Sequence, residues 1–189
     1  MKVTREQAAA NRDRIVEAAG ALFRRHGFDG IGVADIMKAA GLTHGGFYGH
    51  FASKEDLAAE ACAHARRDPW ASWAEAPPDE RLEGIVRGYL TPQHRDDRTH
   101  GCLIAALGSD VVRQPRSVRR AFTERFRSKI DLLRSLVPGR SAAARREKAL
   151  ATMAGLVGAL TLSRAVDDPV LSEEILAAAS NAFGKPERA

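Results

Sequence analysis

Apolar residues recur at helical spacing along most of the 189-residue chain, beginning close to the N-terminus. A first stripe on one side of a helix is formed by Ile15, Ala18, Ala19, Leu22 and Phe23. Gly27 follows this stripe and is placed to end the helix, after which Phe28 is expected to pack back on it. The polar stretch before the stripe has two interpretations. Thr4 and Gln7 have the spacing of a capping box that would start the helix there, but the stretch could also be a loose arm.

The next pattern predicts two short helices joined by a tight turn. An apolar stripe at positions i, i+3, i+4 and i+7 consists of Val33, Ile36, Met37 and Ala40. Gly41 can adopt a positive φ without steric cost, so the chain can reverse there, and Thr43 is a candidate N-cap. The second helix, residues 44–50, is too short to be stable alone and needs packing through Phe47 and Phe51. This is the helix-turn-helix pattern, whose second helix enters the major groove of DNA, although ordinary helical bundles contain it too.

Further helical stripes continue downstream. Ser53 is placed to cap a helix whose first turn is acidic, which suits the helix dipole. An amphipathic helix over residues 82–90 is expected to be closed by Pro92. The polar run 94–100 is expected to be a loop, and residues 101–112 to form a short, largely apolar helix.

Three longer helices are expected in the second half of the chain. Pro115 stands at the start of the first, Ser141 caps the second and Pro169 opens the last. The second of them contains the small residues Gly155, Gly158 and Ala159. Small residues permit the close approach of another helix, so these three are expected either to form a contact surface with a second copy of the chain or to face the chain's own core. Because no stretch alternates between apolar and polar residues as a strand does, the sequence predicts an all-α protein with about nine helices.

The segments IVEAAGALFRRHGFDG, IMKAAGLTHGGFYGHF and ASKEDL, between Ile15 and Leu57, resemble the N-terminal domain of TetR-type transcriptional regulators. The positions that fall at the family's spacing are Gly27, Phe28, Ala40, Gly41, Gly45, Tyr48, Phe51, Lys54 and Leu57. The sequence departs from the family at residues 31–33, IGV, where the family often carries Ser or Thr. This leaves no side-chain hydroxyl there for the usual contact to a phosphate.

The resemblance implies a three-helix helix-turn-helix DNA-binding domain over residues 1–57 and a helical effector-binding and dimerisation domain over residues 58–189. Regulators of this type pair through their last two helices, and a single helix-turn-helix reads too few base pairs for useful selectivity. A symmetric dimer requires a pseudo-palindromic operator in double-stranded DNA. The expected function is therefore a ligand-responsive transcriptional repressor, released from its operator by a small-molecule effector.

The predicted DNA-binding residues lie around the second short helix. They are Thr43, His44, Gly45, Gly46, Tyr48, His50 and Lys54. His44 and the two glycines at the N-terminus of this helix would lie nearest the base edges, where glycine lets the backbone approach closely. The remaining residues would contact phosphates through hydroxyl, imidazole, ammonium or backbone N–H groups.

The predicted effector-binding residues follow from side-chain type alone. They are Trp73, Tyr89, Cys102, Phe122 and Met153, although aromatic and Met residues at helical spacing often belong to a plain core. An alternative is a regulator that senses oxidants or electrophiles through Cys102, since His100 and nearby Arg side chains favour a reactive thiolate, whereas a buried cysteine would be inert. His94, His100 and Cys102 are also three possible metal ligands, but without the repeated spacing of a metal site. No metal and no cofactor is expected.

Charge and composition refine this interpretation only slightly. The formal net charge of +5 favours a polyanionic partner, yet residues 1–57 hold eight basic against seven acidic side chains, so charge alone does not mark the DNA-binding end. The dense Arg cluster over residues 113–129 is interpreted as a solvated helix face rather than a second nucleic-acid site. Neither a membrane span, a signal peptide nor a catalytic motif such as G-x-S-x-G or HExxH is present, so a cytoplasmic protein that is not an enzyme is expected.

Overall fold

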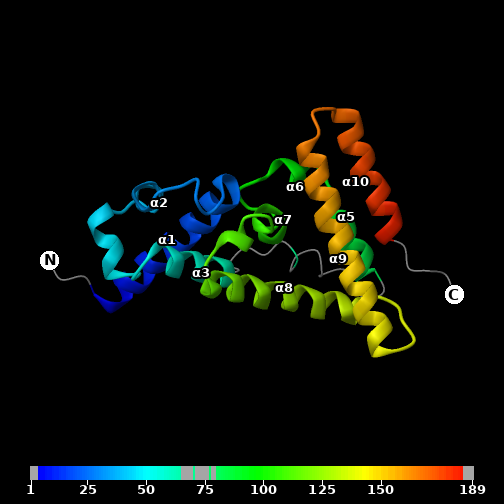
Figure 1. Cartoon of the computed structure of the whole chain (residues 1–189), viewed down its shortest axis with the longest axis horizontal. Helices are drawn as coiled ribbons and strands as arrows, with labels where there is room; N and C mark the ends of the chain where they lie inside the picture. Colours follow the sequence, from blue (N-terminus) through cyan, green and yellow to red (C-terminus); the bar gives the residue numbers. More distant parts are fainter. Residues whose placement is uncertain (1–3, 65–69, 71–76, 78–79, 185–189) are drawn as a thin grey trace. The chain divides into compact units, whose positions relative to one another are not determined.

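A computed structural model describes residues 4–64, 70, 77 and 80–184 of the chain. This part of the chain is built from helices and contains no strand, so the all-α prediction is confirmed. In order, the helices are α1 Arg5–His26, α2 Val33–Ala39, the 3₁₀ helix η1 His44–Gly49, α3 Lys54–Ala63, α5 Arg81–Tyr89, α6 Pro92–Asp96, α7 Leu103–Leu107, the 3₁₀ helix η2 Val111–Arg113, α8 Arg116–Leu136, α9 Ala142–Ala165 and α10 Pro169–Phe183 (Figure 1). None of the described helices is long and apolar enough to cross a membrane.

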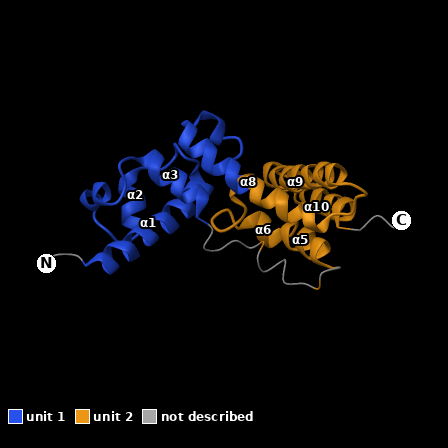
Figure 2. Cartoon of the chain, turned by 90° about the horizontal axis from the view of Figure 1, so that it is seen from below, with its two compact units in different colours: residues 1–67, 106–125 blue, residues 68–105, 126–189 orange. Residues whose placement is uncertain are grey.

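The chain divides into two compact units, coloured separately in Figure 2. Unit 1 consists of residues 1–67 and 106–125, and unit 2 of residues 68–105 and 126–189. Unit 1 is therefore larger than the predicted DNA-binding domain, residues 1–57, because it also contains residues 58–67 and 106–125. Helices α7 and α8 each contribute residues to both units.

Unit 1 is organised around α1, whose boundaries follow the local signals in the sequence. The Thr4 hydroxyl accepts a hydrogen bond from the Gln7 N–H at 3.1 Å, so the helix begins at the capping position and residues 5–14 are helical rather than a loose arm. At the other end, Gly27 adopts φ 77° and the chain turns away. Phe28 then packs back on Phe23, with ring centroids 5.3 Å apart. This contact closes one end of the unit 1 core.

The turn between α2 and η1 also follows the sequence prediction at its glycine. Gly41 adopts φ 68°, the left-handed conformation that glycine takes at low cost. The cap after it differs from the prediction, because the Thr43 side chain makes no capping hydrogen bond and the following helix is of the 3₁₀ type. Its stability comes from packing instead: Phe47 and Phe51 are buried, with stacked rings 5.7 Å apart.

In unit 2, α9 and α10 lie side by side (Figure 1), with α5 packed on α10 and α6 packed on α9. Ser141 caps α9 as expected, and Asp168 caps α10; the two side chains accept hydrogen bonds from backbone N–H groups of the first turn. A Cβ on Gly155 would lie 2.2 Å from the Phe183 ring, so this glycine allows α10 to approach α9 within the chain. Ala159 is buried, whereas the Cβ position of Gly158 is open.

Three sequence predictions for residues 92–112 are wrong. Pro92 does not close a helix but opens α6, where its missing N–H costs nothing at the first helical position. The run 94–100, expected to be a loop, begins inside that helix, and His94 is buried. The apolar segment 101–112 is likewise broken into α7 and η2 instead of forming one helix.

Candidate DNA-binding site

The 3₁₀ helix η1 presents one side to the core of unit 1 and the other to solvent. Phe47 is fully buried, while the neighbouring Tyr48 is 70 % exposed, and their rings meet edge to face at 5.2 Å. The other exposed positions at its N-terminal end are Thr43, His44, Gly45 and Gly46. Five of the seven residues predicted to contact DNA are therefore at the surface of one short segment, held from beneath by an aromatic anchor.

The other two predicted residues frame the C-terminal side of this segment. His50, the C-cap of η1, is half-buried, and Lys54 is the half-buried first residue of α3. The Ser53 hydroxyl accepts a hydrogen bond from the Asp56 N–H at 3.1 Å and so fixes the start of α3, as predicted. The backbone between η1 and α3 is therefore fixed, and it places the Lys54 side chain at the start of α3.

Arg12, on α1, fixes this turn from the side and was not recognised in the sequence. Its Nη1 donates a hydrogen bond to the His50 carbonyl. Its Nε and Nη2 both donate to the Glu60 carboxylate, the first at 3.1 Å. The same group lies 4.1 Å above the centroid of the Phe51 ring. Arg12 thus joins α1, the end of η1 and α3. Because its partners are 38 and 48 residues away, no local sequence pattern indicates this role.

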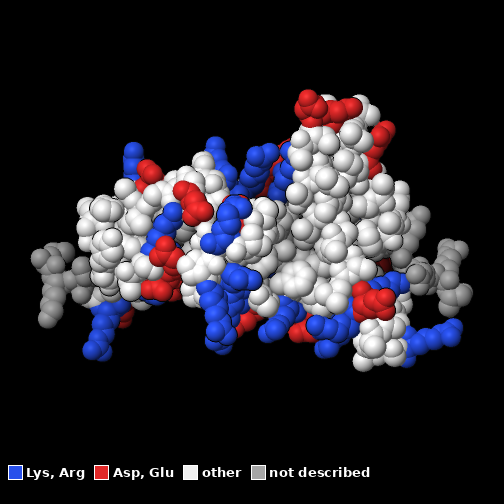
Figure 3. All heavy atoms as spheres, in the orientation of Figure 1, with Lys and Arg blue, Asp and Glu red and all other residues white. Residues whose placement is uncertain are grey.

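The surface charge of unit 1 is mixed. Figure 3 shows Lys and Arg side chains interspersed with Asp and Glu, with the basic groups most concentrated along α8. On α8, Arg120 pairs with Glu124 at 3.0 Å, and both side chains are largely exposed. For its exposed members this agrees with the interpretation of the Arg cluster as a solvated face, since exposed ion pairs on one helix are ordinary surface features. Lys129, at the end of the cluster, is buried instead. The case for DNA binding therefore rests on the geometry of η1 rather than on net charge.

The predicted effector-binding residues are distributed over both units. Tyr89, Cys102 and Met153 are buried in unit 2, Phe122 is half-buried in unit 1, and Trp73 lies outside the described residues. Tyr89 is packed edge to face against Trp70 and His94, at centroid distances of 5.6 and 4.7 Å. Burial, with the Cys102 thiol beside it, raises the pKa of the Tyr89 hydroxyl.

The environment of Cys102 gives the redox alternative no support. The residue is only 7 % exposed, and its N–H donates to His94 Nε2 at 2.9 Å. At Cys62, burial raises the pKa of the thiol to about 12, against the opposing effects of Arg125 and Arg24. Within the described ranges, no three His, Cys, Asp or Glu side chains are grouped to hold a metal ion.

Comparison with known proteins gives consistent matches. The family described as bacterial regulatory proteins, tetR family, matches residues 15–61. The chain is 33 % identical over 94 residues to the HTH-type transcriptional repressor AcnR of Corynebacterium efficiens, a match covering 50 % of this chain and 48 % of that protein. It is 41 % identical over 54 residues to the HTH-type transcriptional regulator TtgR of Pseudomonas putida, covering 29 % and 26 %. In the first match the chain spans about half of its relative's length, and in the second about a quarter.

The similarity to solved structures extends over nearly the whole chain. A TetR-family transcriptional regulator from Agrobacterium tumefaciens is 25 % identical, with a TM-score of 0.74 over 93 % of this chain and 98 % of that one. A TetR-family regulator from Cytophaga hutchinsonii has a TM-score of 0.79 over 100 % of both chains, at 17 % identity. The second likeness concerns the fold alone.

Proposed function

Because the chain belongs to the TetR family of bacterial regulatory proteins, as its N-terminal sequence predicted, we propose that it is a DNA-binding transcriptional repressor that acts as a homodimer. The family and the relatives named above are transcriptional regulators and not enzymes. The observation that carries the proposal is the exposure of His44, Gly45 and Tyr48 on a segment whose opposite side is anchored by Phe47.

In this proposal η1 enters the major groove. The exposed N-terminal end brings His44, Gly45 and Gly46 to the base edges, and the glycines allow close approach of the backbone. Tyr48 and Lys54 contact phosphates on either side, which fixes the register of the protein on the duplex. Backbone N–H groups at the start of α3 add further phosphate contacts.

The test begins with duplex DNA selected by the purified protein from random sequence, followed by binding measurements over a range of salt concentrations. Lys54→Ala is expected to weaken binding to all duplexes and to reduce the slope of log K against log salt by about one unit, because one phosphate contact is lost. His44→Ala is expected to change the order of preference among sequences, by about 1–3 kcal/mol at one base pair.

The matched control is Arg140→Ala, which removes one positive charge from an exposed position in unit 2. It is expected to leave both the affinity and the salt slope close to those of the parent protein. If both unit 1 variants keep the affinity and the sequence preference of the parent protein, the assignment of this segment to DNA is wrong.

The homodimer is proposed to form through α9 and α10. Large apolar side chains remain exposed on both helices: Leu150 and Leu162 on α9, and Val170 and Leu171 on α10. On α9, the small exposed residues Ala151, Ala154 and Thr161 lie on the same helical face as Leu150 and Leu162. An exposed apolar face of this kind on paired helices is suited to a symmetric four-helix contact with a second copy.

Release by an effector is proposed to involve unit 2, with Tyr89, Cys102 and Met153 as candidate contacts. An effector must bind the arrangement of the dimer that does not bind DNA more tightly than the arrangement that does. A thermal-shift screen with and without operator DNA tests this step: a compound that stabilises the free protein and lowers its DNA affinity is an effector. The predicted contact at Trp73 belongs to the same proposal.

A further inference from the structure

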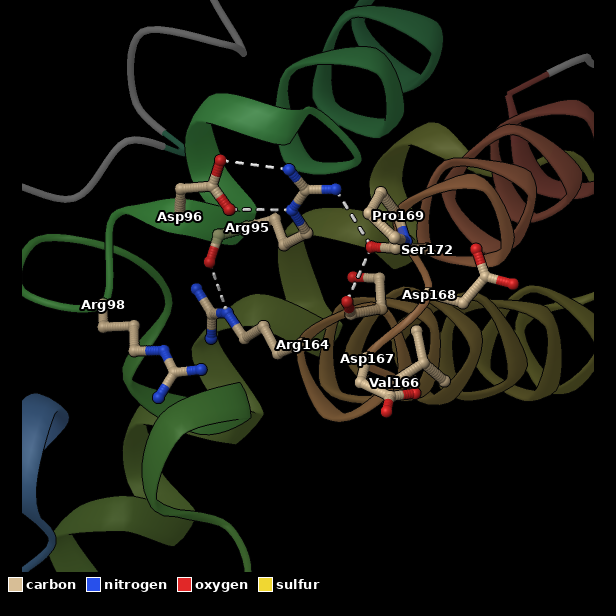
Figure 4. Close-up of a pocket in the computed structure, with 10 residues that line it drawn as sticks. Arg95, Asp96, Arg98, Arg164, Val166, Asp167, Asp168, Pro169 and Ser172 are labelled. Atoms are coloured by element: carbon tan, nitrogen blue, oxygen red, sulfur yellow. Dashed lines mark hydrogen bonds and ion pairs between the residues drawn. The ribbon is translucent and has the colours of Figure 1, made fainter.

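A second feature of unit 2 is a polar pocket of about 320 Å³ formed by the end of α6, the segment after it, the C-terminal end of α9 and the start of α10. None of the residues predicted to bind an effector lines it. Figure 4 shows the guanidinium groups of Arg95, Arg98 and Arg164 together on one side, with Asp167 and Val166 on the other.

Arg164 is fixed in place by the backbone. Its Nε donates to the Arg95 carbonyl and its Nη2 to the His94 carbonyl, both at 2.8 Å. These acceptors are neutral, so the positive charge of the guanidinium is not compensated by them. No other described residue accepts a hydrogen bond from Nη1, and burial lowers the pKa of this guanidinium.

Arg98 adds a second positive charge close by. Its side chain is exposed, and in Figure 4 its guanidinium extends towards that of Arg164. The repulsion between the two groups also lowers the pKa of Arg164. No carboxylate in the described part of the chain forms an ion pair with either group at 4.0 Å or less.

Three of the nearby carboxylates have other partners. Asp96 binds Arg95 through both oxygens, at 2.8 and 3.0 Å, which neutralises that arginine. Asp168 is the N-cap of α10 and accepts hydrogen bonds from two backbone N–H groups. Asp97 accepts from the Thr99 and His100 N–H groups and lies 3.3 Å from the His100 ring. Asp96 and Asp97 still act on Arg164 through space, and Asp167 lines the opposite side of the pocket, but no carboxylate of the described residues pairs directly with Arg98 or Arg164.

We propose that this pocket binds a small oxyanion, a carboxylate or phosphate group, between Arg98 and Arg164. An oxyanion accepts charge-assisted hydrogen bonds from both guanidinium groups and removes the repulsion between them. The volume is sufficient for a small organic anion, whose remaining atoms would extend towards Val166. The site does not depend on the proposed function, since no DNA and no residue of unit 1 takes part.

The test uses isothermal titration of the full chain, without DNA, with inorganic phosphate and separately with succinate. The reference is sodium chloride at matched ionic strength, which accounts for general screening. Arg98→Gln removes one guanidinium from an exposed position and is expected to weaken binding by about tenfold or more. Arg98→Lys keeps the charge but loses the planar pair of donors, so a smaller loss is expected.

The matched control is Arg140→Gln, which makes the same change of charge at another exposed site of unit 2 and should leave binding unchanged. Binding of phosphate, of succinate or of both supports the site and identifies the group it prefers. The proposal is overturned if neither anion binds beyond the chloride reference, if Arg98→Gln binds as the parent does, or if Arg140→Gln weakens binding equally.

Discussion

At the scale of single residues, His94 shows how a polar side chain becomes part of a helical core. Its Nδ1–H donates to the Tyr89 carbonyl at 2.7 Å, and its Nε2 accepts from the Cys102 N–H at 2.9 Å. Both bonds require the neutral imidazole with its proton on Nδ1. Burial lowers the pKa of His94, helped by the nearby Arg164 and opposed by the bond to the Tyr89 carbonyl and by Asp97.

This pKa predicts how stability depends on pH. In the unfolded chain His94 takes up a proton near its ordinary pKa of about 6.5, while the folded protein resists protonation until a lower pH. The unfolded state therefore binds more protons in this interval, and the free energy of unfolding is expected to fall as pH decreases below about 6.5, by at most about 1.4 kcal/mol per pH unit. Chemical denaturation at a series of pH values measures this slope.

The His94→Gln variant is expected to be less stable at neutral pH, because it loses one of two buried hydrogen bonds, and to show a smaller slope below pH 6.5. His26→Gln, a change on the surface of unit 1, should keep the parent slope. Equal slopes for His94→Gln and the parent protein would contradict the role given to His94.

Comparison of single residues shows where sequence patterns are informative. Gly27, Gly41 and Ser53 were predicted correctly because a positive φ or a helix cap depends on the residue itself and on neighbours within one turn. His94 was misplaced in a loop because its burial depends on carbonyl and N–H groups that only the folded chain brings to it.

At the scale of helices, the helix-turn-helix depends on contacts between elements distant in sequence. Arg12 on α1 ties the C-terminal end of η1 to α3 through the His50 carbonyl and Glu60. The aromatic pair Phe47 and Phe51 was visible as an i, i+4 pattern, but this polar tie was not, and the 3₁₀ form of η1 was not predicted either. A segment with three glycines has too little helical preference for its conformation to be read from sequence.

Arg12→Ala is expected to lower the thermal stability of unit 1 and to weaken DNA binding. It removes a hydrogen bond to a backbone carbonyl together with a partly exposed ion pair. The free energy of unfolding is expected to fall by about 1–2 kcal/mol. Arg12→Lys should recover only part of the loss, because a lysine cannot bind Glu60 with two parallel donors.

Thermal unfolding and anisotropy with operator DNA measure the two effects. Arg14→Ala is the matched control, since Arg14 is an exposed neighbour on the same helix. If Arg12→Ala and Arg14→Ala unfold at the same temperature and bind DNA equally well, Arg12 does not support the turn.

At the scale of the molecule, the all-α fold and the family were predicted from sequence because helical periodicity extends along the chain and the N-terminal motif is specific. The packing of the second half was predicted less completely. Gly155 was assigned with Gly158 and Ala159 to a contact surface, but it accommodates Phe183 of the same chain. The sequence shows that such a residue is small, but it does not show which helix packs against it.

Leu162→Glu is expected to shift the protein from dimer to monomer, because it places a charge in the apolar face proposed to pair α9 and α10 with a second copy. Sedimentation velocity at micromolar protein measures the change, and operator affinity should fall with it because half-site binding is no longer cooperative. Val112→Glu alters an equally exposed apolar residue of unit 1 and should remain dimeric. A Leu162→Glu protein that sediments as a dimer would exclude this interface.

The three glycines of η1 also bear on how the proposed DNA specificity of this protein could be redesigned. At Gly45 and Gly49, apart from the adjacent residues and the backbone of the helix itself, no described atom lies within 4 Å of where a Cβ would stand, and neither has the backbone angle that excludes other amino acids. Side chains can therefore be installed at both positions without disturbing the aromatic anchor beneath. In a library that varies these two positions, new operator preferences would arise by addition to an intact scaffold, and each variant could be compared with the parent at nearly constant stability.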